Sequence, residues 1–296
     1  MTVMTWNTVF VLSFGIPLLC NAARPLPEAP YCELLDNVGL LASSQPQTSP
    51  VALDVLERVA LGRHAEIRAE SAAQVGLSLD LLADKWLSTA EVRACALRTI
   101  GRTGLLEAVD FLDNLKEADI GTDPSQQIWT ASQIALRDAR SRRIADPQLK
   151  IEFLESTLVD FERPPGPAGI WAANQLCDSG SLGSLPVIQK AFRKAWSGQY
   201  GEDEIAFCEA RIRVVYGKPD RVKALASVLR VEKAGEDARL TEWAIEQLAS
   251  MHSREAHAEL DRFANEIAKL PAASPGRERF LRFREVIRSI PRASEK

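Results

Sequence analysis

The chain has 296 residues, of which 46% are hydrophobic and 26% are charged, as in soluble globular proteins, and this length allows a substantial core. Its formal net charge of -4 lacks the basic excess that directs a whole molecule to nucleic acid or to an anionic membrane.

The amino terminus carries the features of an export signal. Val9–Cys20 is an apolar run of about 12 residues, which suits a signal peptide and is shorter than the ~20 residues that span a bilayer. Cys20–Ala23 supplies small residues for cleavage, although Met1–Thr8 contains no Lys or Arg. We interpret residues 1–22 as a signal peptide and expect an exported protein, located in the periplasm, in the cell envelope or outside the cell. An uncleaved anchor and a segment without a targeting role are the two alternatives.

Residues 23–48 form a leader that differs from the rest of the chain. Residues 24–30 are rich in proline, which excludes a helix there, and Tyr31–Ala42 is a short helical candidate. Ser49-Pro50 then places a capping residue before a first-turn proline. From this point we predict one helix after another without strand alternation, and we assign residues 49–296 to one domain.

The clearest element is a helical hairpin over Glu91–Leu115. Ser88 followed by Glu91 predicts a capping box at its start. Gly101–Gly104 ends the first arm, because glycine adopts the left-handed conformation that helix ends favour. One face of this arm carries small and aliphatic residues at every fourth position: Val92, Ala96 and Ile100. Since a hairpin with one apolar face per arm cannot bury that face alone, we expect further copies on either side.

Further copies appear when a small residue followed four positions later by an aliphatic residue is aligned. The pairs are Ser71/Val75, Ala96/Ile100, Thr130/Ile134, Ala172/Leu176, Ala210/Val214 and Ala244/Leu248. They recur with an irregular period of about 35 residues. A small residue at this position allows two helices to approach closely. A capping side chain before a first-turn proline predicts a helix start after the turns at Asp123-Pro124, Asp146-Pro147 and Ser274-Pro275.

These residues resemble the HEAT-like repeat in the short form of phycobilisome-lyase-type proteins. The first copy is Glu91-Val92-Arg93 followed by Ala96, Ile100-Gly101 and Gly104; the second is Ala172, Leu176, Gly180 and Leu185-Pro186; the third is Ile67-Arg68 with Gly76. The resemblance implies an all-α fold, a right-handed α-solenoid of about six to seven antiparallel helix pairs. It also implies that the helix with Val92, Ala96 and Ile100 lines the concave side.

Three tryptophans precede the small residue of their copies, and a glutamine follows each of them four positions later. The pairs are Trp129 with Gln133, Trp171 with Gln175, and Trp243 with Gln247. Residues at i and i+4 share a helical face. One interpretation is that the indoles fill gaps between helical layers. The other is a concave groove of aromatic faces and amides that binds an extended peptide or a helix.

The last predicted helix is rich in arginine, and Arg284 and Arg288 lie within it. Such a helix either forms the polar cap that a solenoid needs for solubility or provides a docking face for an acidic partner or an anionic lipid.

The cysteines are expected to be mostly unpaired. In the repeat alignment Cys177 and Cys208 lie about seven positions apart on neighbouring helices, which is roughly 10 Å along the axis and beyond the ~7 Å limit for the Cα atoms of a disulfide. We therefore predict that Cys95, Cys177 and Cys208 are small buried residues, and leave Cys32 open.

No catalytic motif of a metalloprotease, an α/β-hydrolase or a nucleotide-binding protein is present. His252 and His257 are five residues apart, a poor spacing for one metal ion, and with His64 they are expected at the surface. We predict no enzymatic activity, no cofactor and no metal. The predicted function is a scaffold or adaptor that binds a protein or peptide on its concave face, without nucleic acid, and with membrane contact only through an uncleaved signal. Alternatives are an accessory factor of a phycobilisome-lyase-like enzyme system and a structural envelope component.

Overall fold

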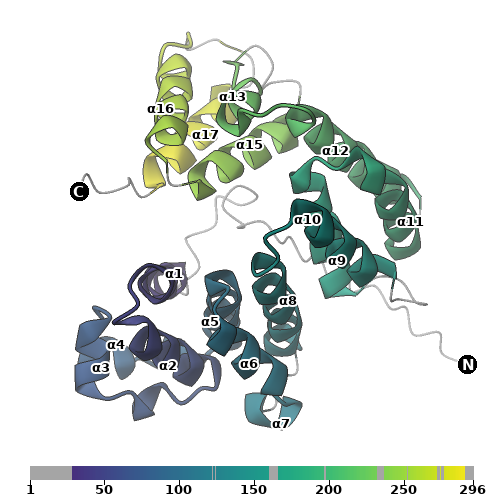
Figure 1. Cartoon of the computed structure of the whole chain (residues 1–296). Coiled ribbons are helices and arrows are strands. Elements are labelled where there is room, and N and C mark those ends of the chain that lie inside the picture. The colour runs from purple at the N-terminus through teal and green to yellow at the C-terminus, as the bar shows by residue number, and fades with distance from the viewer. Residues whose placement is uncertain are drawn as a thin grey trace, which may run out of the picture. The chain divides into compact units, whose positions relative to one another are not determined.

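The computed structural model describes residues 29–121, 123, 125–159, 166–196, 198–231, 237–251, 253–271, 274 and 277–290. Every regular element in these ranges is a helix, and none is a strand, which confirms the predicted all-α class (Figure 1). The predicted signal at residues 1–22 and residues 24–28 of the proline-rich stretch lie outside the described residues. A helix begins at Ala29, so the prediction that proline excludes a helix is wrong for Ala29 and Pro30, because a proline is tolerated in the first turn of a helix. No described helix combines the length and the apolar character that a membrane-spanning segment requires.

The chain divides into two compact units, and the division falls inside α12. The N-terminal unit comprises residues 25–212, and the C-terminal unit contains residues 213–296. The helices are α1 (Ala29–Ser44), α2 (Ser49–Ala60), η1 (His64–Glu66), α3 (Ala69–Gln74), α4 (Leu79–Leu82), η2 (Lys85–Ser88), α5 (Ala90–Thr103), α6 (Leu106–Asn114), α7 (Glu117–Ile120), α8 (Gln127–Arg142), α9 (Pro147–Val159), α10 (Pro167–Ser179), η3 (Leu182–Ser184), α11 (Leu185–Ala195), α12 (Gln199–Val215), α13 (Arg221–Ala226), α15 (Ala238–Ser250), α16 (Arg254–Ala268) and α17 (Arg277–Ser289).

The ends of α5 differ in detail from the prediction. The N-cap is Thr89, whose hydroxyl oxygen accepts the N–H of Val92 at 3.4 Å, and the predicted capping box of Ser88 is wrong. The reason is that Ser88 ends η2 and donates its hydroxyl to the Lys85 carbonyl at 2.7 Å. At the other end the helix continues to Thr103 and stops at Gly104, whose φ of 64° is the left-handed conformation that glycine supplies.

In the N-terminal unit α5 lies between α1 and α8, and α2 packs against both α1 and α5 (Figure 1). Close contact of α5 with α8 depends on Gly101, which is buried inside the helix and does not break it. A Cβ atom at Gly101 would lie 2.7 Å from both Cα and the carbonyl oxygen of Ala135. The two helices therefore approach so closely that no side chain fits at this crossing.

The alignment of small and aliphatic residues matches the buried faces only in part. Ala96/Ile100, Ala172/Leu176 and Ala244/Leu248 are fully buried. In α8 the predicted Ile134 is buried but Thr130 is only partly so, and Ala131 and Ala135, one position later, are both buried. In α12 the buried pair is Cys208 and Ile212. These displacements show that the helices are not related by one constant register.

Arg93 connects three segments of the N-terminal unit. It donates from Nε to the Ala60 carbonyl at 2.9 Å and from Nη2 to the Ile120 carbonyl at 2.7 Å. These carbonyls end α2 and α7, where helix dipoles favour a cation. The carboxyl-terminal ends of α2 and α7 are thereby held beside α5.

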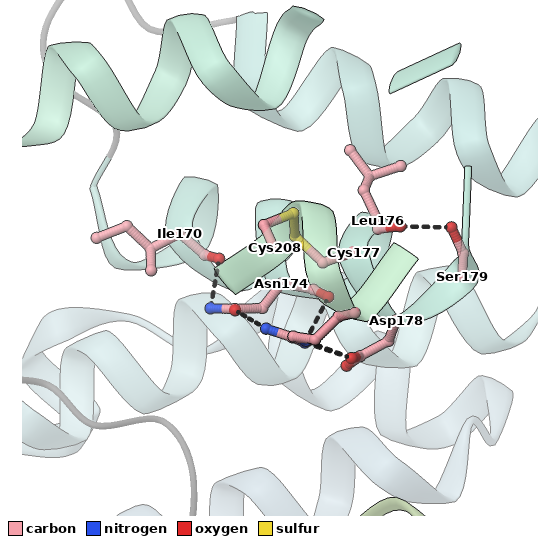
Figure 2. Close-up of a disulfide and its surroundings, with 8 residues drawn as sticks. Ile170, Asn174, Leu176, Cys177, Asp178, Ser179 and Cys208 are labelled. Carbon is pink, nitrogen blue, oxygen red and sulfur yellow. Dashed lines mark hydrogen bonds and ion pairs between the residues drawn. A yellow bond between two sulfur atoms is a disulfide. The ribbon is translucent and has the colours of Figure 1, made fainter. Parts of the chain in front are cut away.

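The expectation of unpaired cysteines is wrong, because the structure contains two disulfides within the N-terminal unit. Cys32 on α1 is bonded to Cys95 on α5, with the Cα atoms 5.5 Å apart. Cys177 on α10 is bonded to Cys208 on α12, with the Cα atoms 5.3 Å apart (Figure 2). The error has a physical cause: the alignment assumed one common register for α10 and α12, and the Cα distance of this disulfide shows that the assumption is wrong.

A buried arginine lies beside the second disulfide. Arg211 is 6% exposed, donates from Nη1 to Asn174 Oδ1 at 2.9 Å, and forms an ion pair with Asp178. Asn174 and Asp178 flank Cys177 on α10 (Figure 2). A buried charge is tolerated when it is paired and hydrogen-bonded, so Arg211 and the disulfide together join α12 to α10.

In the C-terminal unit α13 packs against α15 and α16, and α16 packs against both α15 and α17. The side chains of Trp243, Leu260, Phe263 and Phe283 are buried in this unit.

Candidate functional site

The three predicted tryptophans do not share one environment. Trp171 on α10 and Trp243 on α15 are 8% and 5% exposed, whereas Trp129 on α8 is 37% exposed. The expectation of three indole faces turned to solvent is therefore wrong for Trp171 and Trp243. Trp171 lies in a stretch of α10 in which neighbouring positions, including Ala172 and Ala173, are also buried. Of the three, only Trp129 is in a position to contact a partner through its ring.

The three predicted glutamines are each half-buried, and two of them have partners inside the molecule. Arg137 donates from Nη1 to Gln133 Oε1 at 3.2 Å, on the same face of α8 as Trp129. In the C-terminal unit Arg221 donates from Nη2 to Gln247 Oε1 at 3.0 Å. These amide oxygens are thus engaged within their own unit, and Gln175 is half-buried on α10.

Arg284 and Arg288 both lie on α17, with Arg284 next to its buried face and Arg288 farther from it. The inner side of this helix buries Phe280, Phe283 and Ile287. Arg284 is partly exposed and Arg288 is exposed. This placement agrees with both interpretations of the helix, the polar cap and the docking face.

The two described histidines, His64 and His257, are not arranged as a metal site. His64 and His257 are each partly exposed and lie in different units, and His252 is outside the described residues. Burial lowers the pKa of His64. Among the described residues, no group of three or more His, Cys, Asp or Glu side chains is placed to hold a metal ion.

An open hollow of about 390 Å³ lies in the N-terminal unit, and we call it the α2–α6 hollow. It is lined by residues from the end of α2, from α6 and from the segment through α7: Glu57, Leu61, Asp110, Phe111, Asn114, Leu115 and Asp119. The three apolar members are each partly exposed. The hollow therefore combines a small apolar floor with three carboxyl groups and one amide.

The polar side chains of the α2–α6 hollow differ in their local bonds. Asp119 accepts the backbone N–H of Lys116 at 3.0 Å, and Asn114 donates to the Asp110 carbonyl at 2.8 Å. Asp110 itself is exposed on α6. The hydrogen bonds of Asp119 and Asn114 restrain these two lining side chains.

Glu57 is the half-buried carboxyl group of the hollow. Burial raises its pKa to about 7, and the neighbouring Asp54 carboxylate raises it as well, while Arg58 acts in the opposite direction. Arg58 is engaged elsewhere, since its Nε bonds Asp54 at 2.9 Å and its Nη1 lies 3.4 Å from Glu66. A cation that entered the hollow would therefore stabilise the ionised form of Glu57.

Sequence reasoning missed the α2–α6 hollow, because its residues come from segments about 50 positions apart. One signal was available: Glu57 borders the buried stripe of α2, one helical turn after Leu53, which is buried. A carboxyl group beside such a stripe indicates either an internal partner or a site.

The fold defines the chain as an all-helical protein with two compact units. The chain matches no protein-family model, no curated protein and no solved structure. Its resemblance to HEAT-like repeats thus depends on the sequence positions given above.

Proposed function

We propose that the chain is a non-enzymatic scaffold or adaptor that binds a protein partner, and that the α2–α6 hollow takes one side chain of this partner. The observation that carries the proposal is the combination of three partly exposed apolar side chains with Glu57, whose half-buried carboxyl group has no Lys or Arg beside it among the described residues that line the hollow. The side chain that fits this chemistry has an apolar stem and a cationic head, as in Arg and Lys.

The two parts of such a side chain have separate contacts. Its stem packs against Leu61, Phe111 and Leu115, and its head lies among the carboxyl groups of the hollow. Because the pKa of Glu57 is about 7, the hollow gains negative charge as the pH rises through neutrality. Binding is therefore tighter at pH 8 than at pH 6.

The proposal includes a right-handed α-solenoid of HEAT-like helix pairs as the frame that carries the hollow. Its support is the order of neighbours in the N-terminal unit, where α1 packs on α5, α5 on α8, and α8 on α10. Stacked repeats give such an order, since each copy contacts mainly the adjacent copies.

The proposal also places the protein outside the reducing cytoplasm. Two disulfides within 188 residues of one unit support an oxidising compartment, in line with the predicted export signal.

Selection of peptides from a displayed random library tests the binding proposal. We expect the wild-type chain to enrich Arg or Lys flanked by apolar residues, and the variant Glu57→Gln with Asp110→Asn to lose this enrichment. Glu70→Gln with Asp80→Asn is the matched control, because these two carboxyl groups are exposed on α3 and α4, outside the hollow. Equal enrichment by wild type and the hollow variant would refute the proposal.

A further inference from the structure

The two disulfides lie in different surroundings. Cys177 and Cys208 are buried, with 0% and 1% of their surface exposed. Cys32 is partly exposed on α1, and its partner Cys95 on α5 is nearly buried. An attacking thiolate therefore reaches a sulfur of the Cys32–Cys95 bond more readily than a sulfur of the other bond.

A guanidinium group contacts the Cys32–Cys95 disulfide. Arg98 follows Cys95 by one helical turn and donates from Nη2 to its sulfur at 3.0 Å. Among the described residues, no carboxylate lies within ion-pair distance of Arg98. The nearest relevant carboxylate, Asp36, instead bonds Thr99 Oγ1 at 2.5 Å and Arg102 Nη1 at 3.0 Å.

Arg98 is therefore a partly buried cation that faces an uncharged sulfur. Burial lowers its pKa and the charge of Arg102 lowers it further, while Asp36 acts in the opposite direction. A thiolate at Cys95 would supply the missing counter-ion at the distance already present. A cation beside a cysteine stabilises the thiolate form, which makes that cysteine the better leaving group in thiol–disulfide exchange.

We propose that Cys32–Cys95 is an exchange-active disulfide whose co-substrate is a dithiol, and that Arg98 stabilises Cys95 as the leaving thiolate. This inference is independent of the binding proposal above. It assigns a structural role to Cys177–Cys208, which lies beside the paired guanidinium of Arg211 in the core.

The exchange proceeds in two balanced steps. A thiolate of the dithiol attacks the sulfur of Cys32, a mixed disulfide forms, and the bonding electron pair leaves with Cys95. The second thiol of the dithiol, after losing its proton to solvent, attacks the mixed disulfide and releases Cys32, which takes up a proton. The dithiol is oxidised to its disulfide, and the protein disulfide is reduced by two electrons.

The fold allows this cycle without the loss of α1. Besides the disulfide, α1 is held by the buried side chains of Leu35, Val38 and Ala42 and by the bonds of Asp36 to Thr99 and Arg102. The Cys32–Cys95 bond is thus one of several contacts between α1 and α5, and the burial of apolar surface holds the two helices together when this bond opens.

Partial reduction of the full oxidised chain tests the proposal. The protein is treated with dithiothreitol at pH 7, quenched with acid, alkylated, and analysed by peptide mass mapping. We expect Cys32–Cys95 to open at least ~10-fold faster than Cys177–Cys208, and Arg98→Gln to slow its opening roughly three- to tenfold. Arg63→Gln is the control, since Arg63 is an exposed arginine of the same unit that takes no part in the contacts of Arg98 or of the Cys32–Cys95 bond, and we expect it to leave the rate unchanged.

A second measurement separates the electrostatic role of Arg98 from loss of structure. In the reduced wild-type chain, the pH midpoint for alkylation should be lower at Cys95 than at Cys32, and Arg98→Gln should raise the midpoint at Cys95 alone. Equal opening rates for the two disulfides, or an unchanged rate and midpoint in Arg98→Gln, would overturn the assignment.

Discussion

Glu57→Gln should change the stability of the chain in a pH-dependent way. The folded-state pKa of Glu57 is about 7, above the ordinary value of 4.5. The folded state therefore binds this proton more tightly than the unfolded state, and ionisation costs stability progressively as the pH rises from about 4.5 to about 7. A shift of this size corresponds to at most about 3 kcal/mol, and solvent screening of a half-buried side chain reduces it to about 1 kcal/mol. Glutamine removes the titration while it keeps the shape of the side chain.

Urea unfolding followed by circular dichroism measures this effect. At pH 8.5 we expect Glu57→Gln to be more stable than wild type by about 1 kcal/mol, and at pH 4 we expect the two to be equal within about 0.5 kcal/mol. The control Glu70→Gln changes an exposed carboxyl group on α3, and its free energy of unfolding should differ little from that of wild type at both pH values. A wild type that is more stable than Glu57→Gln at pH 8.5, or a difference that does not vary with pH, would refute the reasoning.

Two further substitutions test the packing. Gly101→Ala should destabilise the chain by about 1–3 kcal/mol, because the added Cβ would lie 2.7 Å from the backbone of α8. The control Gly183→Ala should cost less than about 0.5 kcal/mol, because its added Cβ meets no atom within 4 Å. Equal urea midpoints for the two variants would contradict the close approach of α5 and α8. Trp171→Ala should lower the free energy of unfolding by about 3–5 kcal/mol and Trp129→Ala by less than about 1 kcal/mol, because only the Trp171 side chain is buried. A larger loss of stability for Trp129→Ala than for Trp171→Ala in the same experiment would show that the exposures of the two indoles are misassigned.

The helices and most of their buried faces were predictable from the sequence, because they depend on local periodicity. The apolar positions of α5 and the proline at the start of α9 are examples. At the latter, Asp146 caps the helix by accepting the N–H of Gln148 at 2.7 Å. The predicted start at Ser49 also agrees with α2, although its N-cap is Thr48.

The register between helices was not predictable in the same way. A shift of one position in α8 makes Ala131 the buried small residue in place of Thr130, and no local pattern fixes that choice. The disulfides were missed for this reason, since the pairing of Cys177 with Cys208 depends on the register of two helices. The pairing of Cys32 with Cys95 depends on α1, a helix that had been assigned to a separate leader.

The candidate site was the least predictable feature. The sequence stripe of tryptophan and glutamine indicated a shared face, yet the burial of Trp171 and Trp243 depends on which neighbouring helices cover them. The α2–α6 hollow required the opposite information, namely that nothing covers Leu61 and Phe111 completely. Both facts belong to tertiary packing, which helical periodicity does not specify.

The most direct test of the binding proposal is an NMR titration with n-butylguanidinium, which has the stem and the head of an arginine side chain. The methyl resonances of Leu61 and Leu115 should shift together, and the pKa of the Glu57 carboxyl, followed by its own carbon resonance, should fall from about 7 as the probe binds. Unchanged methyl resonances and an unchanged Glu57 pKa at millimolar excess of the probe would contradict the account.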